Sequence, residues 1–333
     1  MKRYIENPFR LPVLLASFVL MLAGRATAQT FTNLHSFSAL VSNTNSDGAN
    51  PWAGLILSGN TLYGTALGGG NSGWGTVFAI NTKGTGFTNL HSFTAASGSN
   101  YTNSDGANIR GGLLLSGNTL YGTASGGGSW GNGTVFAINT NGNGFTNLHS
   151  FTALDVATDT TNGDGANPYA GLILSGNRLY GTAQWGGTSG NGTVFAINTN
   201  GTGFTNLYSF TALDVATGTT NSDGANPQAG LILSGSTLYG TAQWGGTSGW
   251  GTLFSLSFPS PQLTITLSSP NVDFTWPSGV AGFSYSGFTL QSTTNLGSSA
   301  VWATNSPAPV VVNGQNTVTN PMSGSQQFFR LIQ

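Results

Sequence analysis

The sequence predicts an all-β protein, in which a four-bladed β-propeller-like repeat domain is followed by a small β-sandwich. Three observations support this prediction. The segment FTNLHSF occurs at 31–37, 87–93 and 145–151 and returns as FTNLYSF at 204–210, which makes the repeat about 58 residues long. Each repeat contains four short runs typical of strands, and none of the repeats has helical periodicity. After Pro261 the repeat ends, but short strand-like runs continue.

Residues 1–28 are interpreted as a signal peptide. The basic segment MKRYIENPFR precedes the apolar run LPVLLASFVLMLAG, and Ala26-Thr27-Ala28 is a small-residue cleavage site before Gln29. This run is short for a membrane span, and no later stretch is long enough to be one. We therefore expect export to the cell surface or beyond, with no transmembrane segment in the mature chain. An uncleaved anchor is the alternative.

Composition excludes several classes of function. The chain has no cysteine, so disulfides, thiolate nucleophiles and Cys-ligated metals are ruled out. Charged residues make up 5% of the chain. The expected mature chain keeps four basic residues against eight Asp, a net charge near −4 with no basic patch to meet phosphates. We expect no nucleic-acid partner.

The strands of the first repeat are expected in a definite order. GLILS at 54–58 is almost wholly apolar, as is typical of a strand buried on both faces. An SGN turn leads to TLYGTA at 61–66, and a glycine-rich loop leads to GTVFAINT at 75–82. A short turn then leads to FTNLHSF at 87–93. Four antiparallel strands joined by hairpins, with a longer connection to the next repeat, are typical of a propeller blade.

The expected repeat domain spans residues 29–260, with blades at 54–93, 112–151, 171–210 and 230–257. The last blade lacks a fourth strand, because GTLFSLSF at 251–258 runs directly into a Pro/Ser segment. The N-terminal copy at 31–37 has no blade of its own. We expect it to supply the missing strand and close the ring, because closure removes exposed sheet edges. An open stack, or a ring completed by a second chain, is the alternative.

A glycine precedes the first strand of each blade, at Gly54, Gly112, Gly171 and Gly230. The innermost strands crowd the axis of a small ring, and only glycine lets backbones approach so closely. An ordinary turn at the strand entry is the alternative explanation.

Residues 261–333 are predicted to form the β-sandwich, because their short runs alternate or are apolar and are separated by turn signals. The expected core is Trp276, Phe288, Leu290, Trp302, Phe328, Phe329 and Leu331. A domain of this size without disulfides is small, so we expect it to lean on the repeat domain.

The pattern DGANPxAGLILSGNxLYGTAxxGGxxGxGTVFAINxxGxGFTNLHSF resembles the GloVer tandem repeats of exported bacterial proteins, which carry varied C-terminal anchors. The resemblance covers residues 31–257. The C-terminal runs FTLQSTTNL and QFFRLIQ resemble a terminal β-domain of secreted Verrucomicrobia-type proteins. The resemblance implies export and a repeat-built β architecture, and it implies no particular activity. No terminal sorting motif is recognisable.

The candidate binding residues belong to the loops expected at one end of the blades. If the first strand of each blade runs from top to bottom, the Gly/Trp loops and the DGAN loops both lie at the top. These loops carry Trp74, Trp130, Trp185, Trp244 and Trp250 with Asp47, Asp105, Asp164 and Asp223. One position near the first strands differs in every repeat: Trp52, Arg110, Tyr169 and Gln228. Variation on a regular scaffold indicates a place for a ligand.

Metal and catalytic sites are less favoured. His35, His91 and His149 recur, but the fourth copy has Tyr208, so we interpret the position as structural. One carboxylate per DGAN loop makes calcium binding a weak alternative, and Asp-Gly as a plain turn the better interpretation. The expected mature chain has no Glu, so a glycosidase acid/base pair would need Asp alone.

The sequence therefore predicts an exported, non-catalytic binding or adhesion module without a cofactor. Trp side chains flanked by Asp, Asn and Gln are suited to hold sugars, so surface polysaccharide is the expected partner, with a protein as the other option. A self-associating surface scaffold is the first alternative. A carbohydrate-active enzyme is the second.

Overall fold

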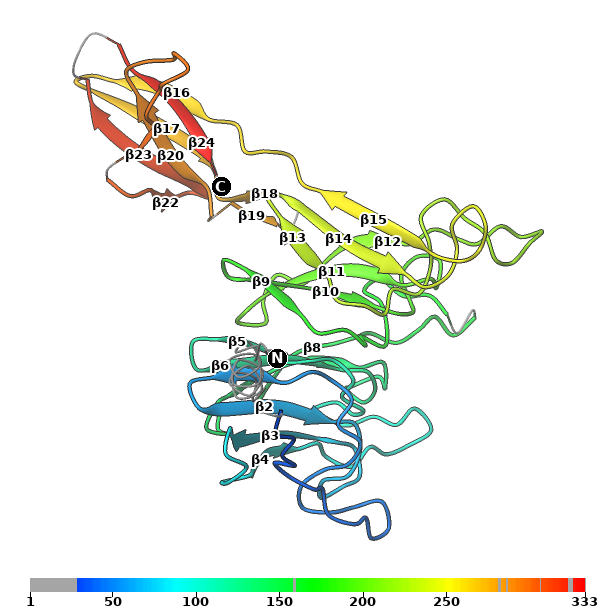
Figure 1. The fold of residues 1–333 in the computed structure, drawn as a ribbon. Coiled ribbons are helices and arrows are strands. Elements are labelled where there is room, and N and C mark those ends of the chain that lie inside the picture. The colour runs from blue at the N-terminus through cyan, green and yellow to red at the C-terminus, as the bar shows by residue number, and fades with distance from the viewer. Residues whose placement is uncertain are drawn as a thin grey trace, which may run out of the picture. The chain divides into compact units, whose positions relative to one another are not determined.

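The structure is a computed structural model that describes residues 29–157, 160–280, 283–285, 287–305, 307–322 and 326–332. The predicted signal peptide at 1–28 lies outside the described residues. The chain divides into two compact units, Met1–Ser36 and Phe37–Gln333. The described residues form strands and no helix, as predicted (Figure 1). It follows that this part of the chain contains no helix capable of crossing a membrane.

Each of the first three repeats forms one antiparallel four-stranded sheet whose strands follow chain order. The first sheet contains β1 (Ile56–Ser58), β2 (Thr61–Ala66), β3 (Thr76–Asn81) and β4 (Thr88–Ser92). The second contains β5 (Leu114–Ser116), β6 (Thr119–Ala124), β7 (Thr134–Asn139) and β8 (Thr146–Ser150). The third contains β9 (Ile173–Ser175), β10 (Arg178–Ala183), β11 (Thr193–Asn198) and β12 (Thr205–Ser209).

The LYGTA motif has a packing reason. Gly64 of β2 lies directly opposite Phe78 of β3, and a Cβ on Gly64 would lie 2.5 Å from the Phe78 ring. The glycine therefore leaves the space that the aromatic ring fills. The other three repeats keep the same arrangement at Gly122, Gly181 and Gly240.

Consecutive repeats pack face to face through apolar side chains. Tyr63 and Val77 of the first repeat share a core with Leu113 and Leu120 of the second. The second repeat packs on the third, and the third on the fourth, through the corresponding positions. Stacking thus buries the second and third strands of the inner sheets. The apolar first strands, predicted to be buried on both faces, are only half-buried in β5 and β9 and largely exposed in β1, because each lies at the edge of its sheet.

The predicted close approach of the glycines before the first strands is found between the second and third repeats. A Cβ on Gly171 would lie 2.8 Å from the carbonyl oxygen of Gly112. Since real Cβ atoms do not approach a backbone atom so closely, only glycine fits here. The spacing is wider on either side, where a Cβ on Gly112 or Gly230 would meet the preceding glycine at 3.8 and 3.7 Å.

The predicted completion of the fourth sheet is wrong. This sheet has only three strands, β13 (Ile232–Ser234), β14 (Thr237–Ala242) and β15 (Thr252–Ser257), and β15 pairs with β14 alone among the described strands. Residues 31–37 form no strand. In the other repeats a short hairpin connects FTNLHSF to the third strand of the same sheet. Among the described residues no third strand precedes the N-terminal copy, so no such hairpin is seen to hold it in register.

The C-terminal region forms three further antiparallel sheets. One contains β16 (Thr264–Ser268), β17 (Asn271–Pro277), β22 (Val310–Val312) and β23 (Gln315–Pro321). The second contains β20 (Thr289–Thr293), β21 (Ala303–Thr304) and β24 (Phe328–Ile332), and the third is a ribbon of β18 (Gly279–Val280) and β19 (Phe283–Ser284). The sandwich and the domain boundary near residue 261 stay predictions.

The expected C-terminal core is largely present. Trp276 and Leu290 are buried, and Phe288, Phe329 and Leu331 pack against them. Trp302 and Phe328 are instead half-buried outside this core, and the guanidinium of Arg330 lies 4.2 Å from the Trp302 ring centroid. The core also continues into the repeats, because the rings of Phe258 and Phe283 stack with centroids 4.4 Å apart. The C-terminal region therefore packs against the repeats, as expected.

Candidate ligand-binding face

Each DGAN loop is fastened to the Gly/Trp loop of its own repeat by an asparagine two residues before the Asp. Asn45 Oδ1 accepts hydrogen bonds from the amides of Gly48 and Gly70, both at 2.9 Å. Its Nδ2 donates to the Gly48 carbonyl at 2.7 Å. Asn103, Asn162 and Asn221 repeat this pattern. The two loops therefore lie side by side, as the strand directions predict.

The Asp residues of these loops bind the fold itself. Asp105 accepts hydrogen bonds from the Thr94 amide at 3.0 Å, from Thr94 Oγ1 at 2.5 Å and from His91 at 2.9 Å. Asp164 receives the same contacts from Thr152 and His149. Asp47, Asp105 and Asp164 are buried. Their carboxylates therefore tie the end of one repeat to the start of the next.

The pKa of Asp105 reflects this role. Burial tends to raise it, but the hydrogen bonds from His91 and Thr94 outweigh burial and hold the pKa below its ordinary value. In the last copy, Tyr208 replaces the histidine and donates its hydroxyl to Asp223 at 2.7 Å. This bond, with some burial, raises the pKa of Tyr208 to about 12. Histidine and tyrosine at this position thus have the same structural role, because each binds the Asp of the next DGAN loop.

Side chains at the position that differs between repeats contact one another across the repeat boundaries. The guanidinium of Arg110 lies 4.8 Å from the ring centroid of Tyr169 and 5.9 Å from that of Trp52. Gln228 instead donates to Gln243 Oε1 at 2.5 Å within its own repeat. Three of the four variable residues are thus brought together. Arg110 and Tyr169 also line a pocket of about 420 Å³, together with Trp74 and Tyr101.

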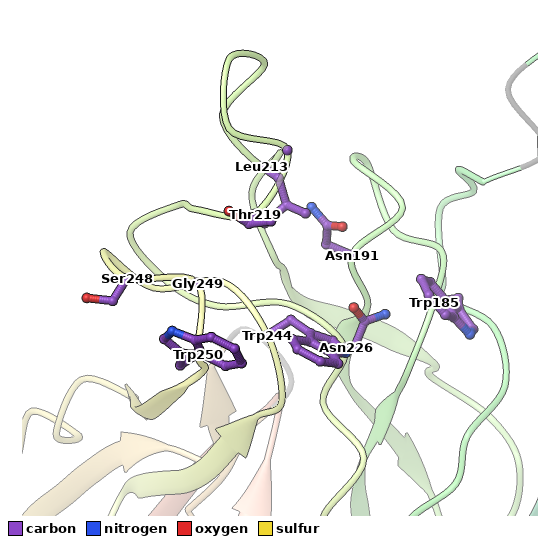
Figure 2. A pocket seen from close by; sticks show the side chains of 10 residues that line it. Trp185, Asn191, Leu213, Thr219, Asn226, Trp244, Ser248, Gly249 and Trp250 are labelled. Carbon is purple, nitrogen blue, oxygen red and sulfur yellow. The ribbon is translucent and has the colours of Figure 1, made fainter.

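A second pocket collects three of the predicted tryptophans. Trp185, Trp244 and Trp250 line a hollow of about 410 Å³ between the third and fourth repeats, with Asn191 and Asn226 (Figure 2). Trp185 and Trp244 occupy the same position in successive repeats, and both are partly exposed at 43% and 45%. Asn226 lies between them in this view. The pocket thus offers aromatic faces with amide groups among them.

The polar part of this pocket was not expected from the sequence. Asn226 is the last residue of a DGAN motif, and it adopts a positive φ of 57°. Its backbone N–H donates to the backbone carbonyl of Asn191 at 2.8 Å, across the boundary between repeats. Asparagine tolerates this left-handed conformation better than most residues, and the DGAN spacing was the available signal. Trp130 is half-exposed but lines neither pocket.

Within the described residues, no three His, Asp, Glu or Cys side chains gather in a way that could hold a metal ion. The weak calcium alternative at the DGAN loops thus gains no ligand cluster in that part of the chain.

The comparison with known families identifies the repeat. The model of the Gloeobacter/Verrucomicrobia repeat matches residues 23–221 and 158–299, two overlapping stretches that span most of the chain. The chain belongs to this family. The matched ranges include all four copies of the Gloeobacter/Verrucomicrobia repeat described above and both pockets. No curated protein sequence matches the chain.

Solved structures show distant likenesses to this Gloeobacter/Verrucomicrobia repeat protein. A GH74 enzyme of Niastella koreensis has a TM-score of 0.38 at 15% identity, over 79% of this chain and 38% of that one. A puromycin-hydrolyzing peptidase of Mycobacterium tuberculosis has a TM-score of 0.36 at 10% identity, over 86% and 42%. The catalytic domain of a Coprinopsis cinerea GH62 α-L-arabinofuranosidase has a TM-score of 0.29 at 11% identity, over 83% and 90%. The chain spans about two fifths of the first two proteins.

Proposed function

We propose that this is an exported, non-catalytic module that binds polysaccharide outside the cytoplasm. The observation that carries the proposal is the pocket lined by Trp185, Trp244 and Trp250. Indole rings present flat apolar faces on which pyranose rings stack, and neighbouring amides can bond to sugar hydroxyls. Asn191 and Asn226 line the pocket beside the rings. Their Nδ2 groups donate to the carbonyl oxygens of Thr211 and Gln184, so their Oδ1 atoms are the candidate acceptors for sugar hydroxyls.

The proposal of a non-catalytic role follows from the carboxylates. A glycosidase uses two carboxyl groups that face the substrate. In the DGAN loops the carboxylates face the backbone and side chains of the preceding strand instead, as for Asp105 with Thr94 and His91. The candidate ligand surface is thus built from aromatic rings and amides. Export rests on the leader-like sequence of residues 1–28.

Intrinsic tryptophan fluorescence tests the proposal. Soluble β-glucan and xylan oligosaccharides are titrated into the protein, and insoluble polysaccharides are tested by pull-down. We expect Trp244→Ala to weaken binding at least about tenfold, because aromatic anchors in pockets dominate such affinities. Trp130→Ala is the matched control, since Trp130 is half-exposed and lines no part of this pocket. A lack of response to all glycans, or equal losses in both variants, would contradict the proposal.

A second candidate function is a self-associating surface scaffold. It is favoured by a different observation, the exposed apolar face of the last repeat, where Leu253 and Trp250 are open to solvent. Large exposed apolar patches in soluble proteins often mark interfaces.

A further inference from the structure

The face of the fourth sheet that points away from the third repeat has the composition of an interface. Leu253 on β15 is 86% exposed, whereas its counterparts Val77, Val135 and Val194 are fully buried. In the first three repeats those residues hold the next repeat in place. Terminal repeats of stacked proteins normally carry a polar outer face. The fourth repeat lacks this feature.

The first repeat offers the complementary face. Leu55 is 52% exposed, whereas its counterparts Leu113, Leu172 and Leu231 are buried against the preceding repeat. The two ends of the stack therefore present the two halves of one interface, which the chain already forms three times internally. A contact between such unlike faces joins copies head to tail.

The fourth sheet also lacks an aromatic side chain that the other sheets have. Phe145 directly precedes β8 of the second sheet and stacks on His91 with ring centroids 3.9 Å apart. Phe204 does the same on His149, at 3.8 Å, one repeat later. The next such slot is a hollow of about 140 Å³ lined by Tyr208, with Phe210 and Phe254 beside it. This is close to the size of cavity that holds a benzene ring, roughly 150 Å³.

The N-terminal segment of the chain has the sequence that fits this slot. Residues 31–37 read FTNLHSF, the sequence that forms β4 and β8. The end of the segment already occupies its place, because Phe37 packs edge-on against Phe78 and Phe87, as Phe93 does on Phe136 and Phe145. The segment therefore leads into the first repeat as each fourth strand leads into the next one.

We propose that a second copy of this chain completes the fourth sheet. Residues 31–37 of that copy add to the free edge of β15 as an antiparallel strand, and Phe31 enters the slot beside Tyr208. The first repeat of the same copy then covers Leu253. Main-chain pairing at a sheet edge supplies affinity, and the aromatic slot supplies register. The inference rests on the scaffold alternative and is independent of glycan binding.

Disulfide trapping tests the register directly, and the absence of native cysteine makes the background clean. Ala79 pairs with Thr88, and Ala137 with Thr146, so the equivalent pair is Ser255 of one copy with Thr32 of the other. Cα atoms opposite one another in an antiparallel pair lie about 4.5–5.5 Å apart, within reach of a disulfide. Chains beginning at Gln29 and carrying either Thr32→Cys or Ser255→Cys are mixed and oxidised.

We expect a covalent dimer in the mixture and little in either variant alone, because neither residue lies opposite its own copy. The double variant should give a ladder of dimers and larger species. An absence of cross-linking in the mixture would overturn the proposal. A cross-linked single chain from the double variant would also overturn it, since the strand would then close the ring of its own chain.

A substitution measured without oxidation gives an independent check. Leu253→Asp should lower self-association by at least about tenfold in light scattering, because a charge would be buried in an apolar contact. The exposed position should leave the melting temperature of the single chain unchanged. Leu267→Asp is the matched control, because Leu267 is also largely exposed, at 75%, and lies on β16, outside the proposed contact. Because no glycan is present, failure here leaves polysaccharide binding untouched. A wild-type chain that stays monomeric at high concentration would refute the assembly.

Discussion

The imidazole Nε2 of His91 lies 2.9 Å from Oδ2 of Asp105, and the two residues belong to successive repeats. The same contact joins His149 to Asp164. These pairs fix the end of a fourth strand to the loop that begins the next repeat. The carboxylates of Asp105 and Asp164, which were candidate ligand groups, thus connect successive repeats. Their removal should lower the stability of the folded protein.

We expect Asp105→Ala to lower the free energy of unfolding by about 1–3 kcal/mol, because the Thr94 amide, the Thr94 hydroxyl and His91 lose their acceptor. Asp214→Ala is the control, since Asp214 is exposed in a loop and its carboxylate, within the described residues, accepts hydrogen bonds only from the amides of Ala216 and Thr217, so its loss should cost about 1 kcal/mol at most. Urea denaturation of both variants measures the difference. Equal losses in the two variants would show that the buried carboxylate of Asp105 contributes no more to stability than an exposed one.

The contribution of Asp105 should depend on pH in a definite direction. Its pKa is lower in the folded protein than the ordinary value of 3.8, so the stability it provides is fully present above pH 3.8. That stability is lost as the pH falls through the folded pKa. The gap between wild type and Asp105→Asn should therefore shrink below about pH 4, because the protonated carboxyl then resembles the amide. A gap that stays constant to lower pH would contradict this account.

Tyr208 should show the opposite dependence. Its pKa is raised from 10.0 to about 12, so the stability from its bond to Asp223 is complete below pH 10 and is lost as the pH rises toward 12. The ultraviolet titration of wild type minus Tyr208→Phe should reveal one tyrosine that ionises near pH 12. Tyr208→His restores the residue pair of the earlier repeats and should fold normally. A difference spectrum with a midpoint near pH 10 would disprove the raised pKa.

The glycines before the first strands should differ in their tolerance of a methyl group. Gly171→Ala places a Cβ 2.8 Å from the Gly112 carbonyl oxygen, and this backbone cannot yield easily. We expect a loss of about 1–3 kcal/mol, the usual cost of overpacking. Gly230→Ala meets the corresponding oxygen at 3.7 Å and should be nearly neutral. Thermal unfolding compares the two, and the prediction is refuted if both variants melt together.

The two arginines of the repeats should also behave differently. Arg178 donates to Asn198 Oδ1, the Gly203 carbonyl and Thr205 Oγ1, so Arg178→Ala should cost about 1–3 kcal/mol. Arg110 makes exposed ring contacts with Trp52 and Tyr169, so Arg110→Ala should cost less than about 1 kcal/mol. Chemical denaturation ranks the variants, and the reverse order would contradict the assignment of Arg110 to the variable ligand surface.

Much of the fold was predictable from the repeat. The order of four strands per repeat, the side-by-side DGAN and Gly/Trp loops and the structural part of the histidines all follow from local pattern and from substitutions between copies. Each is set by contacts within one repeat or between neighbours, such as Asn45 with Gly70. Because these contacts recur in every repeat, the residues that form them recur in the sequence and can be recognised there.

The candidate site was only partly predictable. Trp185 and Trp244 occupy the same position in different repeats and Trp250 another, so only the packing of two repeats brings the three to one pocket with Asn226. The Asp residues were expected to face a ligand, but in the structure they accept hydrogen bonds from the preceding strand. Sequence spacing places a side chain in a loop, but it does not reveal which groups that side chain will form hydrogen bonds with.

The sequence by itself determined the repeat, the all-β class, the absence of disulfides and the candidate residues. Only the tertiary structure decided that β15 pairs with β14 alone among the described strands and that the copy at 31–37 forms no strand. Pairing of strands far apart in sequence depends on whether the stacked sheets curve enough to bring their ends together, and that curvature accumulates from small rotations between repeats. In this chain Leu55 and Leu253 remain exposed at opposite ends of the stack, the two faces through which we propose that copies associate.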